Sequence, residues 1–261
     1  MNMTITEWFL YILFTSSLGS YAAAFAARWP VKNEYLWRKE AHLLLSLPFS
    51  TNEPETVRQR RSQCMSCHHL LAWQDLIPIL SYVFLKGRCR YCKKNISYRY
   101  PIIECLHIMC CLPLPWLTDG AFQLVLHTIV MSTLLTAASI DMKHKLLPDE
   151  CNLLVVACAL LLHLSLDTLE NSVLGLLVGF SLICGLRQCC LVIRRYEGIG
   201  LGDAKLVAAL GAWLGLSNLS ALLLCASLSG ILYTILINQN GSKQIAFGPF
   251  LIFSAILVFY L

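Results

Sequence analysis

Long apolar stretches recur along almost the whole of this 261-residue chain, and they constrain its fold more than any other feature. Hydrophobic residues make up 57% of the sequence and charged residues only 13%, which is about half the charged share of a soluble domain. Such stretches fit the hydrocarbon core of a bilayer, which a helix of about 20 apolar residues can cross. The composition excludes a disordered chain, a collagen, a coiled coil and a secreted disulfide scaffold. We therefore expect an all-α polytopic membrane protein with about eight transmembrane helices.

Several of the expected spans are short for a hydrocarbon core about 30 Å thick. The eight ranges are Trp8–Ala27, Pro101–Leu117, Ala121–Ile140, Cys151–Leu166, Val173–Leu186, Ala204–Leu216, Leu219–Ile237 and Ala246–Leu261. The first range ends in small residues, as a secretory signal does, but Glu7 is the only charge before it and no basic segment precedes it. We interpret this range as a retained transmembrane helix.

Lysine and arginine residues all fall on one side of an eight-span arrangement, as the positive-inside rule requires of cytoplasmic segments. With the N-terminus outside, the inner segments are 28–100, 141–150, 187–205 and 238–245. They hold all 20 basic residues, whereas the outer segments carry only acidic charges. Segment 28–100 alone has 13 basic and 5 acidic residues, so the net charge of +5 reflects one basic cytoplasmic loop.

Four of the 13 cysteines form two pairs in this basic loop. Cys64 and Cys67, and then Cys89 and Cys92, are each separated by two residues, and 21 residues lie between the pairs. Paired C-x2-C knuckles present four thiolates to one tetrahedral zinc ion, which suits a reducing cytosol better than two disulfides do. Four sulfurs leave no open coordination position, so we expect a structural zinc that folds a loop with too little apolar sequence to fold alone.

Residues beside the cysteines offer alternative ligands and a second kind of contact. His68 and His69 follow the first knuckle and could substitute as zinc ligands. Basic residues cluster around the second knuckle, namely Lys86, Arg88, Arg90, Lys93, Lys94 and Arg99. A zinc ribbon with basic flanks could contact nucleic acid, but attachment to the inner face of a membrane makes anionic lipid head groups the simpler partner. We predict that the loop contacts membrane lipids and no nucleic acid.

Two aspartates lie where the predicted spans meet the cytoplasm. Asp141 ends the third span and Asp203 begins the sixth, 62 positions later, with one outward and one returning span between them. Two carboxylates that share a partly desolvated site resist joint ionisation, so one stays protonated while the other deprotonates a water, as in an aspartic protease. Each could instead be an ordinary helix-end charge, and Asp203 is well placed to cap its helix. Asp149 and Glu150 are more simply interpreted as caps of the fourth span.

Taken together, these motifs resemble those of the type IV prepilin leader peptidases, which are membrane aspartic proteases with a Gly-x-Gly-Asp motif. The resemblance covers almost the whole chain. Its matching elements are Gly19-Ser20 with Arg28-Trp29-Pro30, the two C-x2-C knuckles, Ile77-Pro78-Ile79-Leu80-Ser81, Gly87-Arg88, the segment from Ile96 to Glu104, Gly200-Leu201-Gly202-Asp203, Lys205-Leu206, Gly211-Ala212-Trp213-Leu214-Gly215 and Phe247-Gly248-Pro249-Phe250.

The resemblance implies a bifunctional enzyme. Members of this family cleave the short basic leader of type IV prepilins or of type II secretion pseudopilins, and then methylate the new N-terminal residue with S-adenosylmethionine. It implies that Asp141 and Asp203 are the catalytic pair and that the four cysteines hold zinc. Gly87 matches a glycine associated with the methyltransferase activity. No glycine-rich nucleotide fingerprint marks the site of the methyl donor.

The resemblance also implies an organisation and a location. Residues 1–27 would form the first transmembrane helix, 28–100 the zinc loop associated with methyl transfer, and 101–261 a seven-helix protease core. The protein would lie in the bacterial inner membrane, with its N-terminus outside and both the zinc loop and the two acids at the cytoplasmic face. The alternative is a non-enzymatic zinc-ribbon adaptor whose acidic spans conduct ions or dock a partner.

Two positions depart from the family pattern. Tyr21 and Ala22 follow Gly19-Ser20, where the family commonly has an asparagine and branched apolar residues. Leu76 follows Gln74-Asp75, where the family again commonly has an asparagine. If those asparagines contact the substrate or the methyl donor, this chain makes these contacts differently. The sequence gives no indication of which pilin is processed or of the oligomeric state.

Overall fold

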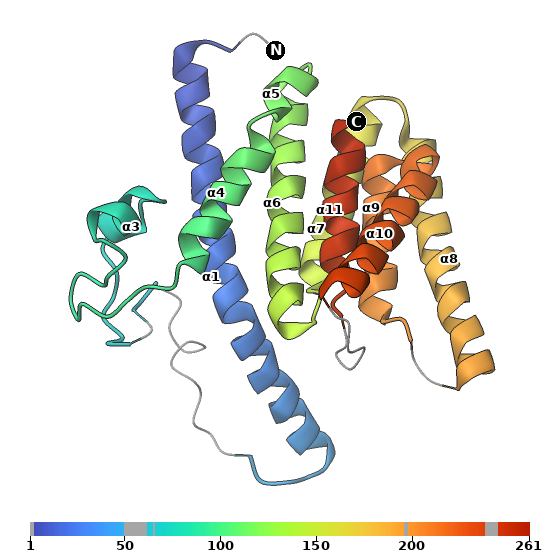
Figure 1. Cartoon of the computed structure of the whole chain (residues 1–261), viewed down its shortest axis with the longest axis horizontal. Helices are drawn as coiled ribbons and strands as arrows, with labels where there is room; N and C mark the ends of the chain where they lie inside the picture. The colour runs from blue at the N-terminus through green and yellow to red at the C-terminus, as the bar shows by residue number, and fades with distance from the viewer. Residues whose placement is uncertain (1–2, 50–61, 65, 196–197, 238–244) are drawn as a thin grey trace. The chain divides into compact units, whose positions relative to one another are not determined.

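Helices dominate the computed structural model, which describes residues 3–49, 62–64, 66–195, 198–237 and 245–261 (Figure 1). The helices, with one 3-10 turn (η1), are α1 (Ile5–Leu44), η1 (Trp73–Leu76), α3 (Leu80–Phe84), α4 (Arg99–Cys111), α5 (Leu114–Leu117), α6 (Ala121–His144), α7 (Asp149–Ser165), α8 (Leu169–Arg194), α9 (Leu201–Leu214), α10 (Leu216–Ile237) and α11 (Gly248–Tyr260). Four of the basic residues used to orient the chain lie outside the described residues, namely Arg58, Arg60, Arg61 and Lys243.

Each of the eight predicted apolar ranges coincides with helical structure, so the all-helical membrane architecture is confirmed. The long loop that carries the four cysteines lies between the first two of these helices, as predicted. Five helical segments are long and apolar enough to cross a bilayer, namely Ile5–Leu44, Arg99–Leu117, Ala121–His144, Leu169–Ile193 and Leu216–Leu236. The count of eight spans stays a prediction.

The first helix extends well beyond the predicted span. The apolar range ends at Ala27, but α1 continues to Leu44 through a polar segment. Its polar part contains an Arg38–Glu34 ion pair one helical turn apart, which stabilises a helix in water. Loss of hydrophobicity marks the exit from a membrane but does not by itself end a helix. The first part of the predicted loop is therefore helical.

One compact unit comprises Met3–Pro113, in which α1 packs against α4. The Tyr11 hydroxyl donates a hydrogen bond of 2.8 Å to the carbonyl of Cys111. Gly19 of α1 allows a close approach, because a Cβ there would lie 3.1 Å from the Cα of Glu104. This compact unit does not test the predicted boundary at residue 101 between the zinc loop and the protease core, which stays a prediction.

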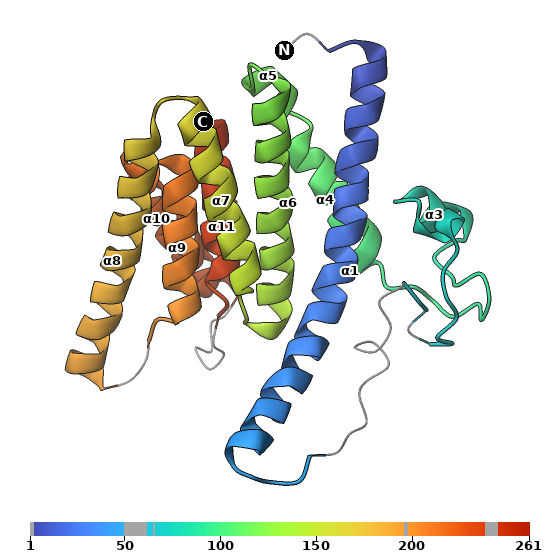
Figure 2. The same cartoon turned by 180° about the vertical axis from the view of Figure 1, so that it is seen from behind.

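The other compact unit contains Leu114–Leu261 and is built around α9 (Figure 2). The helices α7, α8, α10 and α11 all contact α9, and α6 packs against α7 and α11. In α9, nearly every residue from Ala204 to Leu214 is buried, and the exception is Lys205. A helix that is apolar on all faces belongs in the core of a bundle. The shortest predicted span is therefore the central helix of this unit.

Helices α8 and α9 approach each other closely at two facing glycines. A Cβ added to Gly175 would overlap the carbonyl oxygen of Gly211, and a Cβ added to Gly211 would overlap that of Gly175. Small residues at such a crossing let two helix backbones approach, which is how helices pack in membranes. The pair therefore fixes how closely α8 lies against the central helix.

Replacing Gly175 should destabilise the protein, because the new Cβ must push α8 away from α9. We expect Gly175→Ala to lower the free energy of unfolding by about 1–3 kcal/mol, the usual cost of overpacking. Gly185→Ala is the matched control on the same helix, since a Cβ there meets no atom within 4 Å. That change should be neutral or stabilising by up to about 1 kcal/mol, from helix propensity. Thermal unfolding in detergent measures both, and equal effects would contradict the close crossing.

Candidate functional site

The two C-x2-C segments fold into near-identical knuckles. In the first, the Cys64 N–H donates to the carbonyl of His69 and the His68 N–H donates back to the Cys64 carbonyl, both at 3.0 Å. In the second, Cys89 makes the equivalent pair with Lys94 and Lys93, at 2.9 and 3.0 Å. His68 and Lys93, each four residues after the first cysteine of its knuckle, both have positive φ. Two turns with the same backbone conformation thus carry the four thiols.

The four thiol sulfurs gather at one point, as the spacing predicts. All four lie within 4.8 Å of one another, and Cys64 Sγ is 3.8 Å from Cys92 Sγ. Sulfurs bound at about 2.3 Å to one tetrahedral zinc ion lie about 3.8 Å apart, whereas a disulfide needs about 2 Å. The cluster therefore has the donors and the spacing of a four-cysteine metal site. Neither adjacent histidine belongs to it, and the ring of His69 lies 3.7 Å from that of Tyr91.

The local backbone prepares Cys64 to act as a thiolate ligand. Burial raises the pKa of this thiol, but hydrogen bonds from the backbone of Cys67 and Ser66 and from neighbouring thiols outweigh burial and lower it to about 6. A backbone hydrogen bond from His69 lowers the pKa of Cys67. Burial, hydrogen bonds with the sulfurs of Cys64 and Cys92, and the charge of Cys64 outweigh that hydrogen bond and raise this pKa to about 11. A thiolate at Cys64 therefore disfavours a second thiolate at Cys67. A bound cation would remove that conflict, so the cluster is electrostatically suited to a metal.

Gly87 lies two residues before the second knuckle, in a conformation that favours glycine. Its φ is +68°, and a Cβ there would lie 2.9 Å from the hydroxyl of Tyr82. Its carbonyl accepts a hydrogen bond of 2.7 Å from the Ile96 N–H. Gly87 thus lets the end of α3 close against the knuckle. The nearby Asp75, whose side chain is 3% exposed, forms an ion pair of 2.7 Å with Arg90 inside the knuckle.

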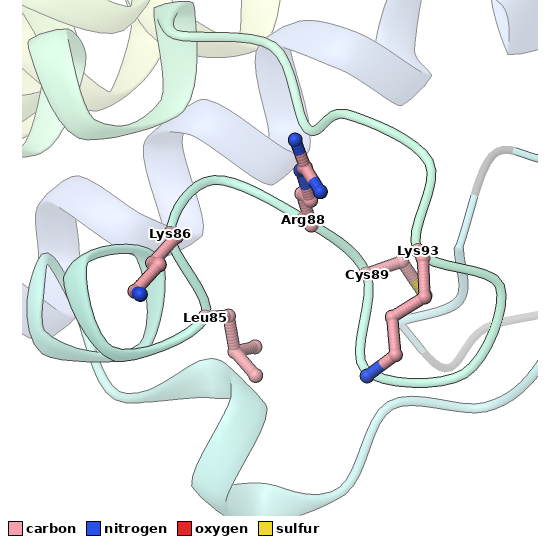
Figure 3. Close-up of a pocket in the computed structure, with 5 residues that line it drawn as sticks. All are labelled: Leu85, Lys86, Arg88, Cys89 and Lys93. Atoms are coloured by element: carbon pink, nitrogen blue, oxygen red, sulfur yellow. The ribbon is translucent and has the colours of Figure 1, made fainter.

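A shallow pocket of about 310 Å³ lies beside Gly87 and the second knuckle (Figure 3). Its lining residues are Leu85, Lys86, Arg88, Cys89 and Lys93. The three cationic side chains point in different directions and do not converge on one point in Figure 3. The pocket therefore shows a basic surface around the knuckle, not a formed anion site.

In the unit Leu114–Leu261, Asp141 lies in the last turn of α6. The helix ends at His144, and the capping residue Lys145 has a left-handed backbone and donates its N–H to the Asp141 carbonyl. The Asp141 residue is 4% exposed, and its Oδ2 has no hydrogen-bond partner among the described residues. A buried carboxyl oxygen without a partner is costly, and in a protein it usually serves a function.

Asp203 lies in the first turn of α9, half-buried. Its carboxylate accepts a hydrogen bond from the backbone N–H of Gly200, the residue that caps the helix. Asp203 thus has the contact expected of a helix-end charge, the alternative interpretation of this residue. This interaction stabilises the helix end and also fixes the direction of the carboxyl group. Capping and a chemical role are compatible.

The end of α6 and the starts of α9 and α11 lie at one end of the bundle (Figure 1). The acids in the last turn of α6 and the first turn of α9 are therefore neighbours. They are close enough for their carboxylates to interact electrostatically. Gly248, the first residue of α11, touches the first acid, because a Cβ there would lie 2.5 Å from Asp141 Oδ2. Leu147 lies between Gly202 and Gly248, since a Cβ at those glycines would be 3.5 and 3.2 Å from its side chain. Three chain segments thus enclose the acid pair.

An ion pair joins the start of α9 to the start of a further helix, α7. Lys205 Nζ lies 2.8 and 2.7 Å from the two carboxylate oxygens of Asp149, which link the start of α9 to the start of α7. Both side chains are exposed, so the pair contributes at most about 1 kcal/mol to stability. The predicted cap at Asp149 is in the first turn of α7, and its carboxylate also makes this cross-helix contact.

Sequence reasoning missed the roles of Gly248 and Leu147. The Phe247-Gly248-Pro249-Phe250 element carries the family resemblance, but nothing in it indicates that Gly248 touches an acid 107 positions earlier. Leu147 stands in a short apolar connection and has no motif of its own. Only the tertiary fold reveals both contacts.

Known families match this chain over most of its length. A family model described as "Bacterial Peptidase A24 N-terminal domain" matches residues 13–118, and one described as "Type IV leader peptidase family" matches residues 128–235. No solved structure matches the chain.

Similar curated proteins come from several bacteria. One is a "Type 4 prepilin-like proteins leader peptide-processing enzyme" of Escherichia coli, 35% identical over 240 residues, which cover 88% of each chain. Two others are named "Prepilin leader peptidase/N-methyltransferase", from Aeromonas salmonicida and Neisseria gonorrhoeae. Each is 33% identical over 93% of this chain and 86% of its own.

The sulfur geometry predicts about one tightly held zinc ion per chain. We expect Cys64→Ser to lose that metal, because three sulfurs hold zinc more weakly than four. Cys105→Ser is the matched control, since Cys105 is an exposed thiol outside the cluster and its loss should leave the zinc content unchanged. Elemental analysis of the purified proteins measures both. Disulfides among the four cysteines, detected by mass spectrometry without reduction, would contradict a metal site.

Proposed function

Because the chain belongs to the type IV leader peptidase family, we propose that it cleaves the leader peptides of prepilins or pseudopilins with Asp141 and Asp203 as its catalytic pair. The observation that carries this assignment is the meeting of the two acids at one bundle end, with Asp141 buried and its Oδ2 unpartnered. The substrate class follows from the names of the relatives. A non-enzymatic adaptor is not favoured, since the relatives that match most of the chain are named as enzymes.

Peptide hydrolysis by an acid pair needs one carboxyl that takes a proton from water and one that gives a proton to the scissile amide. The half-buried Asp203 accepts a hydrogen bond from the Gly200 N–H, which fixes the direction of its carboxyl group. Asp141 is more deeply buried and lies beside Gly248. We assign these roles to the pair jointly, because one proton shared by two coupled carboxyls belongs to both.

Access to the pair depends on small residues. Gly200, Gly202 and Gly248 surround the acids without side chains, so an extended substrate backbone can come within reach of them. The scissile bond of a prepilin lies next to an apolar helix. That helix can lie against the transmembrane helices while the leader stays in water.

The second proposed activity is methylation of the new N-terminal amine with S-adenosylmethionine. Its support is the name N-methyltransferase carried by the relatives, together with a zinc loop in the segment that matches the A24 N-terminal domain. The four cysteines would hold zinc as a structural ion, because all four coordination positions are filled by sulfur. Gly87 would act on this reaction through the placement of Tyr82 and the knuckle.

The chain is a multi-pass membrane protein, and its relatives indicate the bacterial inner membrane. We propose that the zinc loop and the two acids face the cytoplasm and that the N-terminus faces outward. The support is the one-sided distribution of lysine and arginine in the sequence.

Replacing either catalytic acid should abolish cleavage without unfolding the protein. We expect Asp141→Asn and Asp203→Asn each to lower the cleavage rate of a purified prepilin by at least about a hundredfold, because proton transfer is lost. Asp119→Asn is the control, since Asp119 is an exposed acid at the other end of α6. Gel-shift or mass analysis of the product measures the rate. Normal processing by either variant would reject the assignment.

Adding one methyl group beside the acid pair should also inhibit cleavage. In Gly248→Ala the new Cβ would lie 2.5 Å from Asp141 Oδ2, so the carboxyl must move. We expect at least about a tenfold loss of rate, equivalent to about 1.4 kcal/mol of activation free energy. Gly230→Ala is the matched control, because its Cβ would make only ordinary contact, at 3.5 Å from Phe247. Equal rates for the two variants would show that Gly248 does not limit the position of the acid.

A further inference from the structure

A third acid, Glu104, is buried and takes no part in the reactions proposed above. It lies on α4, in the compact unit Met3–Pro113 that also contains the zinc loop, and it is 6% exposed. Its Cα faces Gly19 of α1, so two helices cover it. A buried carboxylate needs hydrogen bonds or a cation to offset its lost hydration.

The described partners of Glu104 are neutral. Oε2 accepts a hydrogen bond of 2.8 Å from the backbone N–H of Ile79, and the side chain of Ser20 also bonds to the carboxylate. None of the ion pairs within the described residues includes Glu104. A carboxylate has about four acceptor positions, so two partners leave room for further donors. Glu104 is thus a buried carboxyl group with spare acceptor positions and no charged partner among the residues that the structure describes.

The backbone that covers Glu104 is strained. Ile79 has φ of +59° and ψ of −51°, which a β-branched residue rarely adopts. The Leu80 N–H donates to the Pro78 carbonyl across Ile79, so the turn is a classic γ-turn, the rare and strained form. Strain of this kind persists where the surroundings impose it, and it clusters at ligand sites. The hydrogen bond to Glu104 holds this turn over the carboxylate.

The methyl transfer offers a matching cation. Peptide cleavage creates an α-amino group, which is largely an ammonium ion at neutral pH. An ammonium group has three N–H donors for the spare acceptors of a carboxylate, whereas the sulfonium of S-adenosylmethionine is a cation without donors. The chemistry of Glu104 therefore fits the amine better than the methyl donor.

We propose that Glu104 binds the α-ammonium group of the processed pilin, accepts one of its protons and so presents the neutral amine, whose lone pair takes the methyl group as the bond between that methyl group and the sulfonium sulfur breaks. The inference rests on the proposed methyltransferase function, and it adds the residue that recognises the acceptor. Ser20 and the Ile79 N–H would hold the carboxylate in place, and the ammonium group would supply the missing countercharge.

The competing explanation is that Glu104 only anchors the Ile79 turn. Glu104→Gln separates the two, because glutamine keeps an oxygen that can accept the Ile79 hydrogen bond but removes the charge. Glu104→Asp keeps the charge on a shorter side chain and should restore part of the function. Both variants should retain zinc and leader cleavage if the fold is intact.

The experiment compares the binding of two processed-pilin peptides, one with a free N-terminus and one with an acetylated N-terminus. We expect the full-length wild-type protein to bind the free form at least about tenfold more tightly, as a charge-assisted hydrogen bond would give. Glu104→Gln should bind both forms equally, with Glu104→Asp in between and the affinity for S-adenosylmethionine unchanged. A wild-type protein without this preference, or a Glu104→Gln variant that keeps it, would overturn the proposal.

Two further outcomes separate this proposal from the proposed function. Weaker binding of S-adenosylmethionine by Glu104→Gln, with an unchanged peptide preference, would place the carboxylate at the donor and overturn the assignment to the acceptor. Failure of the wild-type protein to methylate a processed pilin, followed by mass spectrometry, would instead reject the methyltransferase function itself.

Discussion

The interior of a bilayer offers no water to a carboxylate, and this constraint determines where the protein can perform acid chemistry. The apolar helices satisfy their own backbone groups, and a carboxylate can reach water most readily at their ends. Asp141 and Asp203 use two such ends, at the close of α6 and the opening of α9. Gly248 brings a third helix end against the pair without adding a side chain. The fold thus places two acids together at the ends of apolar helices.

The helix pattern was predictable from hydrophobicity, and the surroundings of the acids were not. Each predicted span coincides with helical structure because apolar runs of this length have few alternatives in a membrane. Counting spans was enough to place Asp141 and Asp203 on one face, although they are 62 positions apart. By contrast, hydrophobicity could not show that α1 continues to Leu44, nor that α9 is central. Those features depend on polar helix formers and on packing between distant segments.

The cysteine cluster was also predictable, because spacing within each knuckle is local information. Four thiols in two C-x2-C pairs have few uses besides a shared metal, and their sulfurs do gather at one point. The strained turn at Ile79 and its bond to Glu104 left no such signal, since 25 positions separate the two residues. Local motifs therefore predicted the four-thiol cluster, and the fold was needed to reveal the acid that the same unit buries.

The central claim is that Asp141 and Asp203 form one catalytic unit. When two groups act as one unit, removing either one already removes their joint effect. The rate losses of the two single variants therefore do not multiply in the double variant. The most direct test is the single-turnover cleavage rate of the double variant Asp141→Asn, Asp203→Asn, compared with each single variant on one prepilin. A shared site predicts that the double variant is about as slow as either single variant, within a few-fold. Losses that multiply in the double variant would show two independent contributions and would contradict the account.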